Sequence, residues 1–581
     1  MIKSKKIILV VIFSIFFISP AYSARFPYPI IFVHGLIGSD LTFEKTMQYL
    51  KDEYDLGPIY VFDMLLNADN DLSTSNIVDD VRWEDFIYDG ILSNATIKLG
   101  KRTFDKVFTK VEDGWDIKRP SQLFAINFQE ERIRGASGFN DLFDQSNQAG
   151  IFKQGFAIGI MIQEVLEFTG AEKVILIGHS MGGLAIREYL QRTDQKGNHQ
   201  WWVHPENSQG HHVAKVITIG TPHLGSNAAC DPTRYSQKRS GIPDFNGTSE
   251  ALRDLKYSFD TYPDCNSMSP IGIYLFGGNE NCLGSEFNNS DINCDGITND
   301  SIIGLDQDTT DNPNMPLPLD IHYSWIISDV SFGENPQCLN RFGWICSGST
   351  CDNEPPGDGA VLLERQWLYS VNNTPVPDKV SNRFMTHTIH TEEGSDYSVI
   401  IIALDEPDDI TLAYSIKLDT VITGLINSQP DDEPTDIDIF KIETKYPSLF
   451  TLQINCSRET IQDISILDSL ENELFFSLTK QFPFHMNFYT SPDIIGNIFI
   501  KIKGTPFSNS YKYPYTISIS RDILEIKANF EADKFIGNVP FTVNFLDLSK
   551  SENTTISSWL WDFGDGTTSH EKYPQHTYLT P

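Results

Sequence analysis

A serine in a glycine-rich turn is the residue of this sequence best suited to nucleophilic chemistry. Ser180 lies within GHSMGG, residues 178–183, between the apolar run VILI and a helical pattern. A strand that turns sharply into a helix presents such a serine above a sheet, and the flanking glycines leave room for the neighbouring backbone. The start of the helix also favours developing negative charge. We therefore predict a nucleophilic Ser180 at the end of a buried strand.

A second glycine-rich turn lies near the N-terminus. Residues 28–33 have the pattern of a buried strand and continue directly into HGLIG, residues 34–38. Backbone N–H groups at such strand ends can hold an oxyanion, and we predict that those of Leu36 and Met181 do so here. His34 precedes the serine and lies at the strand end, so we expect it to brace the turn rather than to act as a base.

The segments around these turns alternate between strands and helices. Residues 148–168 have apolar side chains at helical spacing, whereas residues 122–127 and 215–220 have strand patterns. Strands that alternate with helices indicate a mostly parallel α/β sheet. Residues from about 64 to 118 are polar and acidic, which we interpret as an insertion. The stretch from 225 to 321 is expected to form lid or cap insertions around the site.

Three motifs occur in the order FVHGLIG, GHSMGG and IGTPHLGS. Together they resemble the secreted bacterial lipase and esterase branch of the α/β-hydrolase superfamily, over roughly residues 26–405. The resemblance implies an α/β-hydrolase fold, which is a mostly parallel sheet with helices on both faces and lid or cap insertions. It also implies a serine ester hydrolase whose catalytic residues follow the chain order Ser, acid, His.

That chain order restricts the choice of acid. Asp358, within GDGAV, follows the strand-like residues 321–328, precedes the helix-like LLERQWL, and resembles the family's Asp-Gly-x-Val acid. Asp-Gly is also a common turn dipeptide, and Asp329, at the end of the preceding strand pattern, is the alternative. We favour Asp358.

Two histidines, His387 and His390, follow the acid and precede the C-terminal modules. We expect a strand over residues 383–389, and the catalytic histidine of this fold lies in the loop beyond a strand end. This favours His390, with His387 as the second choice. A helix over residues 397–404 is expected to follow.

These residues predict a mechanism. His390 accepts the proton of Ser180, Asp358 orients the imidazole and stabilises its charge, and the N–H groups of Leu36 and Met181 hold the oxyanion. An acyl-enzyme forms, and water releases the acyl group. No cofactor is required for this chemistry.

The composition limits the partners and the compartment. The formal net charge of −34 argues against binding to nucleic acid or to anionic membranes. Residues 1–23 have three early lysines, a short apolar run and small residues before Ala24, which predicts a cleaved signal peptide and a secreted protein. No later segment is long and apolar enough to cross a membrane.

A calcium loop and disulfides are also expected from the residue types. Asp291, Asn293, Asp295 and Asn299 surround a glycine bend and offer oxygen ligands at alternate positions, although the twelfth position of the EF-hand pattern is Ile302. The alternative is an acidic surface turn. Seven of the eight cysteines lie between residues 230 and 351 and Cys456 lies apart; secretion would permit disulfides, but spacing does not fix their pairing.

Two all-β modules follow the hydrolase segment. Alternating apolar residues over 413–522 predict a β-sandwich, which resembles the pre-peptidase C-terminal domain of secreted bacterial enzymes. Residues 523–581, with WDFGDG, resemble a PKD domain, with Trp559 or Trp561 in its core and a hairpin turn at residues 564–566. An Ig-like sandwich needs about 80–100 residues, so we expect this copy to be truncated. The predicted domains are thus 1–23, 24–412, 413–522 and 523–581.

The function expected from the sequence is that of a secreted lipase or carboxylesterase acting on lipid or other acyl esters. The β-sandwich modules are expected to contact a polymer, a cell surface or a partner protein. The alternatives are an extracellular polyester depolymerase, a phospholipase, or a non-catalytic adhesin or binding protein on a hydrolase scaffold. The length of the acyl chain is left open.

Overall fold

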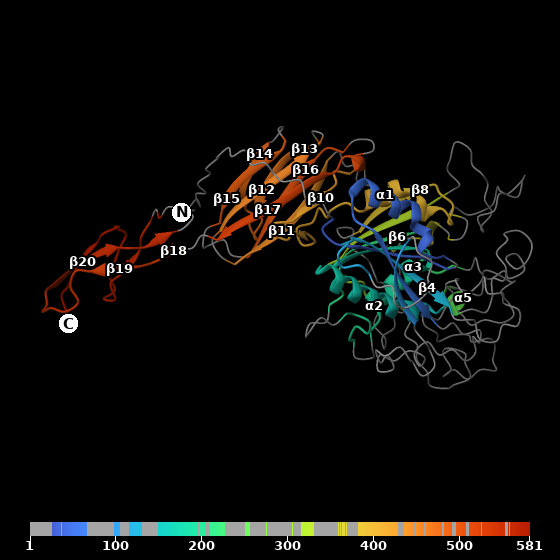
Figure 1. Ribbon diagram of the computed structural model, residues 1–581, viewed down its shortest axis with the longest axis horizontal. Coiled ribbons are helices and arrows are strands. Elements are labelled where there is room, and N and C mark those ends of the chain that lie inside the picture. The colour runs from blue at the N-terminus through green and yellow to red at the C-terminus, as the bar shows by residue number, and fades with distance from the viewer. Residues whose placement is uncertain are drawn as a thin grey trace, which may run out of the picture.

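The protein forms three parts that follow one another along its long axis: blue-to-yellow helices and strands, then orange strands, then red strands (Figure 1). The computed structural model describes residues 26–36, 38–66, 98–104, 115–130, 149–193, 197–203, 210–226, 250–255, 275, 305, 315–329, 358, 361, 363–366, 368, 381–427, 435–445, 448–457, 460–478, 482–490, 496–506, 510–523, 526–551, 556 and 558–580.

An eight-stranded sheet forms the centre of the first part. Its strand order is β3-β2-β4-β1-β5-β6-β7-β8, and every neighbouring pair is parallel except β2 and β3. The strands are β1 (Ile30–Val33), β2 (Ile59–Leu66), β3 (Lys98–Thr103), β4 (Leu123–Glu130), β5 (Val174–His179), β6 (Val213–Ile219), β7 (His322–Ser328) and β8 (Ser381–Thr386). The carboxyl ends of the parallel strands therefore meet at one edge.

Helices cover both faces of this sheet, so its strands are apolar on both sides. In β1, Ile31 and Val33 belong to the apolar core on the side of α2 and α3, whereas Ile30 and Phe32 belong to the core on the side of α1 and α7. This arrangement confirms the predicted α/β-hydrolase fold. The helices are α1 (Glu44–Tyr54), α2 (Ile151–Thr169), α3 (Met181–Gln191), α5 (Glu250–Leu255) and α7 (Tyr397–Ala403).

Two predictions about this part need correction. The polar segment 64–118 is not only an insertion, because β2 continues to Leu66 and β3 forms the antiparallel edge of the sheet. The last strand, β8, ends at Thr386 rather than at residue 389. The helix-like LLERQWL contains a short 3-10 helix over Leu363–Arg365.

Two further sheets form the β-sandwich of the second part. One has the order β10-β17-β12-β15 and the other β14-β13-β16-β11-β9. Along β12, the buried Phe450, Leu452 and Ile454 alternate with half-buried residues, as expected for a strand with one face in a core. The strands are β9 (Tyr414–Ser415), β10 (Val421–Gly424), β11 (Asp436–Thr444), β12 (Ser448–Cys456), β13 (Ile461–Leu467), β14 (Glu473–Leu478), β15 (Phe484–Tyr489), β16 (Gly496–Gly504) and β17 (Tyr515–Ile523).

The first two parts share one apolar core. Ile400 and Leu404 of the hydrolase part lie in the same cluster as Tyr414 and Phe440 of the sandwich. Hydrogen bonds also join the parts. The hydroxyl of Tyr54 donates to the carbonyl of Tyr511 at 2.5 Å, and the amide of Ser415 donates to the hydroxyl of Tyr28 at 3.1 Å.

Short antiparallel strands form the third part. The ring of Trp561 lies 5.6 Å from the rings of both Phe530 and Phe545, which places it in a small apolar cluster. Gly564 and Gly566 have φ values of +81° and +86° between β22 and β23, so the predicted hairpin turn is confirmed. The strands are β18 (Ile526–Lys527), β19 (Phe530–Ala532), β20 (Phe541–Asp547), β21 (Lys550–Ser551), β22 (Trp561–Asp562), β23 (Thr568–Ser569) and β24 (Gln575–Tyr578).

Several expectations lie on other stretches of the chain. Residues 1–23, the cysteines between 230 and 351, and the loop of Asp291, Asn293, Asp295 and Asn299 lie outside the described residues. Cys456 is buried in the sandwich, with its sulfur 3.3 Å from the hydroxyl of Thr460. Among the described residues, no helix combines the length and the apolar composition needed to cross a membrane.

Candidate active site

Ser180 occupies a strained turn between β5 and α3. Its φ of +54° and ψ of −130° are unfavourable for a residue with a side chain, and such strain is found mainly at functional sites. The turn passes close to the end of β1. A Cβ added to Gly182 would lie 2.3 Å from the carbonyl oxygen of Val33, so only glycine allows this approach. The turn therefore holds the serine where β1 and β5 end side by side.

Hydrogen bonds connect Ser180, His390 and Asp358 in a line. Nε2 of His390 lies 2.8 Å from Oγ of Ser180, and Nδ1 of His390 lies 2.9 Å from Oδ2 of Asp358. A carboxylate only accepts, so Nδ1 carries the hydrogen, and in the neutral imidazole Nε2 is left to accept from the serine hydroxyl. The structure thus brings the three predicted catalytic residues together in the geometry that activates a serine.

The loop that carries Asp358 is fixed by its neighbours. The amide of Val361 donates to Oδ1 of Asp358 at 2.7 Å, and the amide of His390 donates to the Asp358 carbonyl at 3.1 Å. The side chain of Gln366 spans from the carbonyl of Val361, at 3.0 Å, to the main chain of Ser328 at the end of β7. Asp358 is fully buried. These contacts hold its carboxylate toward the imidazole.

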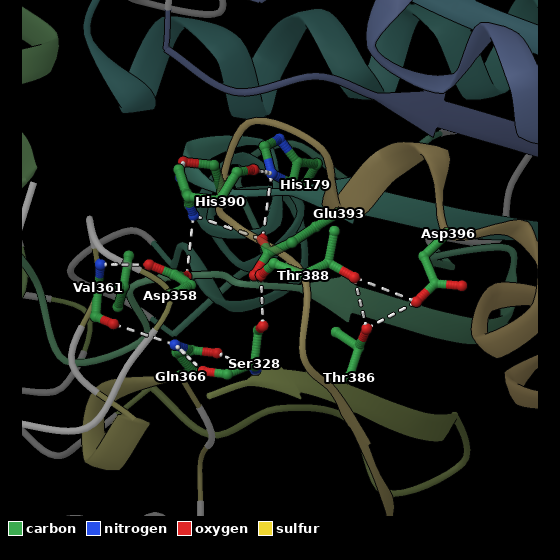
Figure 2. Close-up of polar contacts among 11 residues, drawn as sticks. His179, Ser328, Asp358, Val361, Gln366, Thr386, Thr388, His390, Glu393 and Asp396 are labelled. Carbon is green, nitrogen blue, oxygen red and sulfur yellow. Dashed lines mark hydrogen bonds and ion pairs between the residues drawn. The ribbon is translucent and has the colours of Figure 1, made fainter. Parts of the chain in front are cut away.

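The loop that carries His390 is fixed in a similar way (Figure 2). The hydroxyl of Ser328 donates to the carbonyl of Thr388 at 2.6 Å, and the hydroxyl of Thr386 donates to Asp396 at 2.6 Å. His179, within the serine motif, has its Nε2 2.8 Å from the carbonyl of His390. A carbonyl only accepts, so this nitrogen donates. His179 therefore connects the serine turn to the histidine loop.

Glu393 is a second buried carboxylate beside His390, and Figure 2 shows dashed lines from the imidazole of His390 to both Asp358 and Glu393. Oε2 of Glu393 lies 3.4 Å from Nδ1 of His390 and 3.3 Å from Nε2 of His179. Space for it comes from Gly220, which has φ of +52° and where an added Cβ would lie 1.9 Å from Oε2. The first glycine of the IGTPHLGS motif, Gly220, thus admits this carboxylate.

The two carboxylates control the charge of the imidazole. Burial lowers the pKa of His390, but Asp358 and Glu393 outweigh burial and raise it to about 10. Burial raises the pKa of Asp358. Burial also opposes ionisation of Glu393, yet His179 and His390 together hold its pKa below the usual value. The protonated imidazole is therefore favoured, and its neutral form becomes dominant only in alkaline solution.

The predicted oxyanion residues lie at the same edge. Met181 is the first residue of α3, where amide groups have no carbonyl partner within the helix, and Leu36 follows β1 in the turn beside it. His34 braces that turn. Its Nε2 accepts from the amide of Phe128 at 2.9 Å and its Nδ1 lies 3.0 Å from the carbonyl of Gly35. Burial lowers the pKa of His34 to about 4, which keeps it neutral.

The residues considered as alternatives for the base and the acid, His387 and Asp329, contact each other instead of Ser180. His387 is exposed just beyond β8, and its Nδ1 is 2.7 Å from the main-chain carbonyl of Asp329. This contact with His387 uses the main-chain carbonyl of Asp329 rather than its carboxylate. His390, by contrast, uses both ring nitrogens in hydrogen bonds to Ser180 and Asp358.

Sequence reasoning missed Glu393, His179 and Gln366. Glu393 follows the equally acidic Glu392, and nothing in the sequence indicates which of the two is buried. His179, His390 and Glu393 also present ligand atoms within 4.8 Å of one another, a spacing that suits a metal ion. Because both nitrogens of His390 are engaged by the serine and the aspartate, a metal here would disrupt the hydrogen-bonded line.

Family comparisons match two segments of the chain. Residues 157–309 match the lecithin:cholesterol acyltransferase family, and residues 534–581 match the PKD domain. These matches confirm the resemblance of the first part to lipases and of the last part to PKD domains. A triacylglycerol lipase from Pseudarthrobacter phenanthrenivorans is 43% identical over 68 residues. The chain spans only 16% of the length of that relative, and the match covers 12% of this chain.

Solved structures are similar to this chain at low TM-scores. The lipase BlEst2 of Bacillus licheniformis, in its propeptide form, has a TM-score of 0.28 and 13% identity, over 94% of this chain and 96% of that chain. The pre-peptidase C-terminal domain of a collagenase from Bacillus anthracis has a TM-score of 0.15 and 15% identity, over 20% of this chain and 99% of that chain.

Proposed function

We propose that this chain is a serine hydrolase that cleaves carboxylic acyl esters. The observation that carries the proposal is the hydrogen-bonded line from Ser180 through His390 to Asp358, with the serine on a turn of positive φ. A serine, a histidine and an aspartate connected in this order can act as a nucleophile, its general base and the group that orients the base.

The proposed reaction has two halves. Oγ of Ser180 attacks the ester carbonyl while Nε2 of His390 takes its proton, and the amides of Leu36 and Met181 stabilise the negative charge on the former carbonyl oxygen. The imidazolium then protonates the leaving alcohol, which departs and leaves an acyl group on the serine. In the second half, His390 removes a proton from water, water attacks the acyl carbonyl, and the proton passes to Oγ as the acid is released.

Asp358 and Glu393 give the imidazolium its stability during both halves. Both carboxylates are buried and lie within 3.4 Å of Nδ1 of His390. Their charge lowers the energy of the transition state, in which the imidazole has gained a proton. It also makes the free imidazole hold a proton more tightly, so the enzyme should need alkaline solution for full activity.

The substrate class is proposed from the comparisons. The lecithin:cholesterol acyltransferase family and the triacylglycerol lipase are both named for acyl esters of lipids. We therefore propose a lipid ester as the substrate, and a secreted enzyme without a cofactor requirement. Structural calcium at Asp291, Asn293, Asp295 and Asn299, disulfides among the cysteines, and contacts of the β modules with polymers or cell surfaces stay predictions.

Hydrolysis of a panel of esters tests the proposal. Purified wild-type protein and Ser180→Ala are compared on soluble p-nitrophenyl esters of increasing chain length, on emulsified triacylglycerol and on phosphatidylcholine. A preference for emulsified long chains indicates a lipase, confinement to short soluble esters an esterase, and phosphatidylcholine cleavage a phospholipase. Equal ester hydrolysis by wild type and Ser180→Ala would show that the proposed mechanism is wrong.

A further inference from the structure

A cluster of carboxylates lies where the hydrolase part meets the β-sandwich. Asp405 and Glu406 follow α7, whereas Asp436 and Asp438 begin β11. These four side chains are at most 2% exposed, and the nearby Asp408 is exposed to solvent. We call these five residues the junction cluster. Its members come from both parts of the protein, in the two stretches 405–408 and 436–438.

The oxygens of the junction cluster converge. One side-chain oxygen from each of Asp405, Glu406 and Asp438 lies within 4.8 Å of the other two, and the same holds for Asp405, Asp408 and Asp436. Calcium binds carboxylate oxygens at about 2.3–2.6 Å, so two ligands on opposite sides of one ion are about 5 Å apart. The spacing within each of these two groups of three oxygens therefore suits one ion.

Two of these side chains have an oxygen that no group in the described part of the chain satisfies. Oε2 of Glu406 accepts from the amide of Leu425 at 3.0 Å, and Oδ2 of Asp438 accepts from the hydroxyl of Tyr515 at 2.6 Å. Their other oxygens, Oε1 of Glu406 and Oδ1 of Asp438, are buried and have no hydrogen-bond partner among the described residues. Burying such acceptors is costly unless a donor or a cation meets them.

Positive charge near the cluster comes from Lys215 on β6. Its ammonium donates to the main-chain carbonyl of Asp405 at 2.5 Å and lies 3.1 Å from Nδ1 of His322. Among the described residues, the charge of this ammonium acts on the buried Asp405, Glu406 and Asp436 and on the exposed Asp408.

We propose that the junction cluster binds a calcium ion that fastens the β-sandwich to the hydrolase sheet. All its ligands are carboxylate oxygens, which hard divalent cations prefer, and the exposed Asp408 opens the site to solvent. The ion joins the segment after α7, which belongs to the part that carries His390, to β11 of the sandwich. The ligands of this site are different residues from those of the loop predicted at 291–299, and failure of this proposal would leave the proposed ester hydrolysis untouched.

The test uses the whole chain, stripped of metal with EDTA and titrated with calcium chloride by calorimetry. Two carboxylates are converted to amides of the same shape in the double variant Glu406→Gln/Asp438→Asn. The matched control is Asp522→Asn, the same change at an exposed aspartate on β17 of the same sandwich. A further variant, Asp295→Asn, reports binding at the predicted loop. Wild type and the control should bind calcium alike, and the double variant at least about tenfold more weakly.

Thermal unfolding adds a second readout, because calcium should reverse the order of the unfolding temperatures of wild type and the double variant. In EDTA the double variant should unfold at a higher temperature than wild type, because it has lost two repelling carboxylates. In saturating calcium the order should reverse, with wild type raised by about 4 °C or more. Wild type without calcium binding or calcium-dependent stability would overturn the proposal. Undiminished binding by the double variant, or binding lost only in Asp295→Asn, would also overturn it.

Discussion

Removal of the charge on Glu393 should shift the pH dependence of catalysis. The base His390 acts only when neutral, and its pKa is raised to about 10 by the carboxylates beside it. Activity is therefore lost as the pH falls through that value. The variant Glu393→Gln keeps the shape of the side chain and removes one of the two charges. The rising limb of the profile of kcat/KM against pH, which reports loss of the proton from His390, should then move to lower pH.

The size of this shift follows from the distance between the two groups. Oε2 of Glu393 and Nδ1 of His390 are 3.4 Å apart, and opposite charges at this distance attract by about 5 kcal/mol at an effective dielectric constant of about 20. Because about 1.4 kcal/mol corresponds to one pH unit, this attraction is an upper bound of about 3.6 pH units. The imidazole is 16% exposed, which weakens the attraction. We expect a shift of about 1–3 pH units.

The assay is the hydrolysis of a short p-nitrophenyl ester from neutral to alkaline pH. The rate of spontaneous cleavage, measured without enzyme at each pH, is subtracted. The control is Glu392→Gln, the same change at the adjacent, exposed glutamate. The plateau rate of Glu393→Gln should also fall, since the imidazolium of the transition state loses a partner. Thermal unfolding at each pH verifies that the variant is folded. An unmoved limb, a limb moved to higher pH, or an equal shift in Glu392→Gln would refute the reasoning.

Three other variants test the positions assigned to single residues. His390→Ala should lower kcat on the order of 10⁴-fold or more, whereas the exposed His387→Ala should leave it unchanged in the same ester assay; the opposite pattern would exchange their roles. Gly182→Ala places a Cβ 2.3 Å from a carbonyl oxygen and should cost on the order of 1–3 kcal/mol of stability together with most activity, which thermal unfolding and ester hydrolysis would detect. Tyr54→Phe removes the hydroxyl that donates to the buried carbonyl of Tyr511 and should destabilise the protein by about 1–3 kcal/mol. An unchanged unfolding temperature would show that this hydrogen bond does not stabilise the protein.

Local patterns in the sequence predicted the fold and the positions of the catalytic candidates. Buried parallel strands are continuous apolar runs, and the glycines of the serine turn are required by backbone contacts that few other residues allow. Both signals are local, so β1, β5 and the turn at Ser180 could be recognised. The choice of His390 over His387 came from the expected position beyond a strand end. The strand ends at Thr386, so both histidines lie beyond it, and contacts with distant residues distinguish them.

Long-range contacts could not be predicted in the same way. β3 is an edge strand with the sequence KLGKRT. Its residues are mostly polar, so the sequence of this segment did not indicate a strand. Glu393 lies only three residues from His390, but its burial beside the imidazole depends on Gly220, far away in sequence, which leaves space for its carboxylate. The junction cluster likewise depends on the docking of the sandwich against the hydrolase part. No spacing within a single segment encodes such contacts.

Covalent labelling of the serine tests the central claim most directly. A fluorophosphonate reacts with a serine only when a base activates it, and peptide mass spectrometry then identifies the modified residue. We predict one adduct, on Ser180, with parallel loss of ester hydrolysis, much slower labelling of His390→Ala, and no labelling of Ser180→Ala. An unlabelled wild-type protein that still hydrolyses esters, or an adduct on another serine that abolishes activity, would contradict the proposal that Ser180 is the nucleophile.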